Sequence, residues 1–99
     1  MHIGTMTDIT TFRLRISGNV QGVGFRAWSI GEATRLKLDG WVRNRSDGTV
    51  EMMISGSDRT VQDMLGACTQ GPEGAIVTNI DIHNEKEAPA QGFVGKPSV

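Results

Sequence analysis

Apolar and polar residues alternate strictly near the start of the chain. Residues 11–17 place three apolar side chains on one face and polar side chains between them. This period of two is typical of a half-buried β-strand. Residues 25–37 then carry apolar residues at roughly helical spacing, which predicts a helix there. Gly31 inside this segment costs about 1 kcal/mol relative to alanine, which weakens the helical signal without removing it.

The next two apolar runs predict a pair of antiparallel strands. The first strand covers residues 40–45. In it, the side chains of Val42 and Asn44 point to one face, and those of Trp41 and Arg43 point to the other. The turn that follows contains Asp47 and Gly48, which favour local hydrogen bonds to the backbone and a positive φ. Residues 49–55 are therefore expected to return antiparallel to the first strand.

The second half of the chain predicts a helix followed by one or two strands. Ser57 is a suitable N-cap, and apolar residues at i, i+3, i+4 and i+7 from Val61 give the clearest helical pattern in the sequence. Residues 75–83 predict a strand whose apolar residues do not all share one face, which a β-bulge would explain. Residues 92–96 predict a short final strand.

These elements follow in the order strand, helix, strand, strand, helix, strand. Two such β-α-β halves predict an α+β fold, the ferredoxin-like split β-α-β sandwich. It has an antiparallel sheet of four to five strands with both helices on one face. We expect residues 11–99 to form this single domain and residues 1–10 to be a flexible leader.

The composition limits the partners of such a domain. With 99 residues, a net charge of −1 and a pI near 6.1, the chain lacks the concentrated basic stripe that non-specific binding of nucleic acid or membrane surfaces needs. Cys68 is the single cysteine, and no Cys/His cluster has metal-ligand spacing. Together with the lack of a secretory or membrane-spanning segment, these features predict a cytoplasmic protein that uses no metal and has no nucleic-acid or membrane partner.

The stretch from Ser17 to Arg26 contains three glycines between the first strand and the first helix. Glycines let successive backbone N–H groups converge, a helix N-terminus favours negative charge, and an arginine adds a planar fork of donors. The glycine spacing matches neither the dinucleotide fingerprint nor the nucleotide-binding loop. The stretch therefore predicts either an anion-binding loop or a tight connection without a ligand. The candidate loop residues are Asn19, Val20, Gln21, Gly22, Val23, Gly24 and Phe25.

Two segments of the chain resemble the signatures of the acylphosphatase family. The first signature is matched by Ile16, Gly18, Val20, Gln21, Gly22, Val23, Phe25 and Arg26, and the second by Gly40, Trp41, Val42, Arg43, Asn44, Gly48, Val50 and Gly56. The resemblance runs from about Phe12 to the C-terminus. Lys37 is a departure, because relatives often place glycine at this position.

The resemblance implies hydrolysis of acyl phosphates to a carboxylate and inorganic phosphate by a small, monomeric enzyme that needs no cofactor. It implies that Arg26 binds the phosphoryl group with the backbone N–H groups of the loop, and that Asn44 orients the attacking water. A non-catalytic module that senses anions on the same fold is the alternative. A single-stranded RNA binder is disfavoured, because Arg13, Arg15 and Ser17 on the polar face of the first strand include no aromatic residue for stacking bases.

Residues near the two signatures have structural explanations. We expect Gln21 to shape the loop rather than to contact substrate. Arg43 and Arg45 are expected to be solvated and to add a positive field that attracts an anionic substrate. Cys68 lies on the apolar face of the second helix and is expected to be an inert core residue.

Overall fold

The computed structural model describes residues 8–99. Its elements are β1 (Ile9–Asn19), α1 (Phe25–Arg35), β2 (Asp39–Asn44), β3 (Val50–Ser57), α2 (Asp58–Cys68), β4 (Ile76–Asn84) and β5 (Phe93–Gly95). The leader predicted at residues 1–10 lies outside the described residues up to position 7, and β1 already includes residues 9 and 10. Neither helix of the described part is long and apolar enough to span a membrane.

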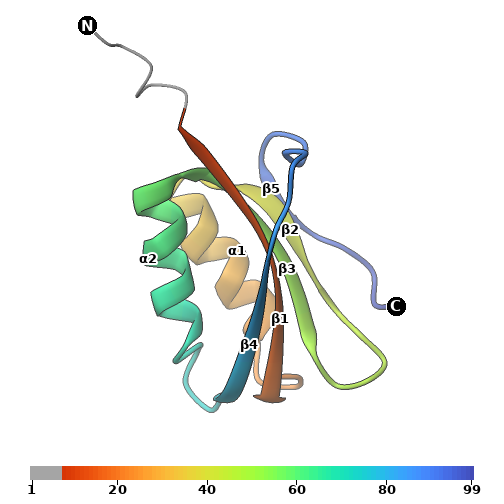
Figure 1. Ribbon diagram of the computed structural model, residues 1–99. Helices are drawn as coiled ribbons and strands as arrows, with labels where there is room; N and C mark the ends of the chain where they lie inside the picture. Colours follow the sequence, from red (N-terminus) through yellow and green to blue (C-terminus); the bar gives the residue numbers. More distant parts are fainter. Residues whose placement is uncertain (1–7) are drawn as a thin grey trace, which may run out of the picture.

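The five strands form one sheet in the order β4-β1-β3-β2-β5. The pairs β1–β3, β1–β4 and β2–β3 are antiparallel, whereas β5 lies parallel to β2. Both helices cover the same face of the sheet, and the other face has no helix over it (Figure 1). The ferredoxin-like α+β fold is thus confirmed, with a final strand that makes the sheet mixed rather than wholly antiparallel.

The core lies between the two helices and the face of the sheet that they cover. Its largest fully buried side chains alternate along the central strands, as the period of two predicted, and come from one stripe of each helix. They include Leu14, Ile16, Val42, Val50, Met52, Ile54, Phe25, Val61, Met64 and Cys68. Burial, with a smaller effect of Glu32, raises the pKa of the Cys68 thiol to about 12. Cys68 is therefore a core residue whose thiol stays protonated.

A β-bulge at the start of β4 explains why the apolar residues of this strand do not alternate regularly between the two faces of the sheet. Ser17 of β1 lies opposite Asn79, but Gly18 lies opposite Val77, so Thr78 is an extra residue in β4. Gly18 has a φ of +126°, and a Cβ there would lie 2.1 Å from the carbonyl oxygen of Ile76. The bulge and this glycine together bring the two chains close at the point where β1 leads into the loop.

Lys37 ends α1 in a conformation that favours glycine. Its φ is +59°, its N–H donates to the Thr34 carbonyl at 3.0 Å, and the N–H of Leu38 donates to the Ala33 carbonyl at 2.9 Å. This pair of hydrogen bonds is the Schellman motif, in which the left-handed residue is usually glycine. Lys37 therefore adopts the left-handed conformation that glycine usually supplies at this position, and its backbone is strained as a result.

Lys37→Gly is expected to stabilise the protein by about 0.5–1 kcal/mol, because the relief of left-handed strain exceeds the extra freedom of glycine in the unfolded chain. Thermal unfolding measures the change as a rise in Tm. Arg35→Gly is the matched control: Arg35 is also basic and exposed, but it has helical geometry, so this variant should lower Tm. A lower Tm for Lys37→Gly would contradict the strain argument.

Candidate active site

The loop between β1 and α1 presents backbone donors at a helix N-terminus. Gly22 and Gly24 have φ values of +76° and +80°, in the left-handed region that glycine adopts without strain. Gly24 is the N-cap of α1, and no side-chain hydrogen bond caps the helix. The first N–H groups of α1 therefore keep their capacity to bind an anion, and the helix dipole favours negative charge there.

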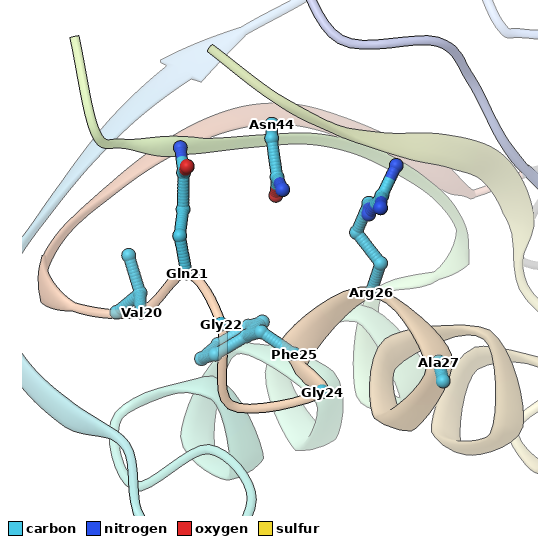
Figure 2. Close-up of a pocket in the computed structure, with 8 residues that line it drawn as sticks. All are labelled: Val20, Gln21, Gly22, Gly24, Phe25, Arg26, Ala27 and Asn44. Atoms are coloured by element: carbon cyan, nitrogen blue, oxygen red, sulfur yellow. The ribbon is translucent and has the colours of Figure 1, made fainter. Parts of the chain in front are cut away.

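A pocket of about 220 Å³ lies over this loop and reaches β2 (Figure 2). It is lined by Val20, Gln21, Gly22, Gly24, Phe25, Arg26, Ala27 and Asn44. Of the candidate loop residues, Asn19 and Val23 do not line it: Asn19 is the last residue of β1, and Val23 packs against the core. Ala27 lines the pocket although no sequence motif marked it.

Arg26 occupies the first turn of α1 and is exposed. Figure 2 shows its side chain extending from the helix toward β2. Within residues 8–99 no carboxylate forms an ion pair with it, whereas Arg13, Arg15, Arg43 and Arg45 all have such partners. Its guanidinium group is therefore available to an anion bound in the pocket.

Asn44 is the last residue of β2 and faces the pocket from the opposite side. Its side chain extends toward the loop in Figure 2. Val42, two residues earlier, is fully buried on the helix-covered face, as the alternation predicted. Between them, Arg43 lies over the ring of Trp41 on the other face, 4.9 Å from the ring centroid. Strand parity thus directs Asn44 into the pocket.

Gln21 connects the loop to the hairpin between β2 and β3. Its side-chain Nε2 donates to the carbonyl oxygens of Arg45 at 2.8 Å and Thr49 at 2.9 Å. These bonds use both amide hydrogens of the side chain. The expectation that Gln21 shapes the loop agrees with these contacts, which fix the distance between the loop and the strand that carries Asn44.

Arg43 and Arg45 are only partly solvated, with side chains that are 26% and 30% exposed, and both form an ion pair that was not expected. Both donate to the same oxygen of Glu51, at 2.8 Å and 2.7 Å, and Glu51 is only 4% exposed. Burial raises the pKa of the Glu51 carboxyl, but the hydrogen bonds and charges of the two arginines lower it by more. The pKa of Glu51 therefore lies below its usual value. The carboxylate offsets much of the positive field that the two arginines would project.

Sequence reasoning did not single out Glu51. Glu51 lies opposite Arg15 of β1 and Arg43 of β2, a signal that appears only once the register of the three strands is known. Among residues 8–99, no group of three or more His, Cys, Asp or Glu side chains is placed to hold a metal ion.

Comparison with known proteins decides the family. The family model for acylphosphatases matches residues 12–94. The chain belongs to the acylphosphatase family. Among curated members, an acylphosphatase from Rhizorhabdus wittichii is 45% identical over 87 residues, which cover 88% of each chain. One from Acidiphilium cryptum is 51% identical over 82 residues, covering 82% of this chain and 89% of its own.

Solved structures of the family share the fold. An acylphosphatase from Coxiella burnetii superposes with a TM-score of 0.87 at 30% identity, covering 92% of this chain and 96% of its own. One from Bacillus subtilis gives a TM-score of 0.84 at 34% identity, covering 88% and 98%. The chain is thus an enzyme of this family, and nothing in these comparisons favours a non-catalytic module that senses anions.

Proposed function

We propose that this protein hydrolyses the carboxyl–phosphate bond of acyl phosphates by attack of water on phosphorus. The observation that carries the mechanism is the placement of Arg26 and Asn44 on opposite sides of one small pocket, over an uncapped helix N-terminus. The products are a carboxylate and inorganic phosphate. The acyl phosphate is a small molecule whose phosphate end enters the pocket.

The loop and Arg26 would bind the phosphoryl group. The N–H groups near Gly22, Gly24 and the start of α1 supply donors with fixed positions, and the guanidinium of Arg26 supplies a charged, bidentate one. Phosphoryl transfer depends mainly on positioning and on stabilising charge at the equatorial oxygens. This set of donors meets both needs without reorganisation during the reaction.

Asn44 would hold the attacking water. Its amide carries both an acceptor and two donors, so it can fix the orientation of a water molecule, but it cannot serve as a base. It extends from β2, across the pocket from the loop (Figure 2). A water bound there would approach phosphorus from the side opposite to the leaving group, as in-line displacement requires.

The leaving group explains why these residues suffice. None of the eight lining residues is a carboxylic acid, a histidine or a cysteine. The group that departs from an acyl phosphate is a carboxylate, whose conjugate acid has a pKa of about 4, so it leaves as a stable anion without a general acid. We propose that the reaction needs no metal ion for the same reason.

We further propose that the enzyme acts in the cytoplasm as a monomer. Its single cysteine, Cys68, is buried in the core and serves packing, which suits a reducing compartment. The pocket is lined by residues from one loop, one helix and one strand of the same chain.

Hydrolysis of benzoyl phosphate in buffer containing a chelator tests the proposal. We expect turnover far above the uncatalysed rate, with competitive inhibition by inorganic phosphate at millimolar concentrations. A module that only senses anions would bind phosphate and leave the rate of hydrolysis at background. Background rates with correctly folded protein would therefore refute the enzymatic function, and turnover that disappears with the chelator would refute metal independence.

A further inference from the structure

Glu51 is a buried carboxylate that the mechanism above does not use. It lies on β3, on the face of the sheet that no helix covers (Figure 1). Besides the bonds from Arg43 and Arg45 to its Oε1, its Oε2 lies 3.4 Å from Nη1 of Arg13. Three guanidinium groups from β1, β2 and the following turn therefore meet at one carboxylate.

Two of these arginines directly precede and follow Asn44. Arg43 and Arg45 reach Glu51 on one face of the sheet, while the Asn44 side chain points into the pocket on the other. The main chain of Arg45 continues the connection: its carbonyl accepts the hydrogen bond from Gln21 of the loop, and its N–H donates to Thr49. Glu51 is thus linked through Arg43 and Arg45 to the end of β2, and through Arg45 and Gln21 to the loop.

The Asn44 amide depends on its backbone for its position. Among residues 8–99, no side-chain hydrogen bond holds the amide, and the carbonyl of Asn44 accepts from the N–H of Val99 at 3.1 Å. The direction of the amide is therefore set by the backbone at residues 43–45. A change of a fraction of an ångström there moves the group that would orient the water.

We infer that Glu51 is a positioning residue for the reaction: by holding Arg43 and Arg45 together, it fixes the end of β2 so that Asn44 faces the bound phosphate. Arg13 and Arg15 on this face also pair with Glu85 and Asp47, whereas Glu51 is the one carboxylate among residues 8–99 that pairs with Arg43 and Arg45. Without the Glu51 carboxylate, repulsion between the Arg43 and Arg45 guanidinium groups would move the end of β2. The inference rests on the proposed function.

Glu51→Gln tests the inference, because glutamine keeps the size of the side chain and removes its charge. We expect kcat for benzoyl phosphate to fall about tenfold, and the inhibition constant of inorganic phosphate to change less than about twofold, because the loop and Arg26 are intact. Glu85→Gln is the matched control. Glu85 pairs with Arg13 at 2.8 Å and does not contact Arg43 or Arg45, so kcat should be unchanged.

A double-mutant cycle with Asn44→Ala separates positioning from a general structural effect. If Glu51 acts through Asn44, Glu51→Gln should not lower kcat further in a protein that already lacks the Asn44 amide. The same fold-loss in both backgrounds, or an unchanged kcat in Glu51→Gln alone, would overturn the inference. A lower KM with unchanged kcat would also overturn it, since it would mean that Glu51 only masks the attraction of the arginines for substrate.

Arg45→Gln covers the case in which Glu51→Gln does not fold. This variant leaves Glu51 paired with Arg43 and Arg13, so no buried charge loses all its partners. Its kcat should also fall, but by less than in Glu51→Gln. A wild-type kcat in Arg45→Gln would count against the inference. A wild-type protein without hydrolase activity would refute the proposed function itself, whereas an active wild type with unaffected variants refutes only the role of Glu51.

Discussion

Arg26→Ala is expected to lower kcat/KM for acyl phosphates by about a thousandfold or more. The guanidinium group is the one positive charge among the residues that line the pocket, so its loss weakens both the binding of phosphate and the stabilisation of charge in the transition state. Steady-state kinetics with benzoyl phosphate measures the effect. Because Arg26 is exposed, Tm should stay close to that of the wild type.

Two further variants make this result specific. Arg59→Ala removes an exposed arginine from α2, away from the pocket, and should leave kcat/KM unchanged. Arg26→Lys keeps the charge but loses the bidentate geometry, so it should recover only part of the activity. Wild-type kinetics in Arg26→Ala would remove Arg26 from the mechanism.

Asn44→Ala is expected to lower kcat by about a hundredfold with little change in the inhibition constant of inorganic phosphate. The amide would act on the attacking water and not on the bound phosphoryl group, so its loss affects turnover more than binding. Comparing kcat with phosphate inhibition in the same preparation separates the two effects.

The control for this variant is Asn84→Ala. Asn84 ends β4 as Asn44 ends β2, but it is exposed and does not line the pocket. Its kcat should equal that of the wild type. If Asn44→Ala instead weakened phosphate inhibition and left kcat unchanged, Asn44 would belong to phosphate binding and the water would be held by another group.

Local periodicity predicted most of the fold. Alternation in β1 and β3 identified the buried face, and the broken alternation in residues 75–83 indicated the bulge that the structure places at Thr78. The direction of β5 was not predictable. A strand of three residues carries no signal that shows which strand it pairs with or in which direction. Tertiary contact alone decides that β5 lies parallel to β2.

The family resemblance implied that Arg26 and Asn44 share one site, and both line the pocket, whereas Asn19 and Val23 of the predicted loop do not. Strand parity separates Asn44 from Arg43, and the glycines place Arg26 in the first turn of α1. The pairing of Arg43 and Arg45 with Glu51 was missed, because it depends on the register between β2 and β3 and on the absence of a helix over that face. Register is a property of two strands together, so neither strand shows it alone.

Hydrolysis in water enriched in ¹⁸O tests the central claim most directly. If water held by Asn44 attacks phosphorus, the P–O bond to the acyl group breaks and the label appears in inorganic phosphate. Attack on the carbonyl carbon would break the C–O bond and place the label in the carboxylate. We predict ¹⁸O in the phosphate released by the enzyme, and label in the carboxylate product would contradict the account.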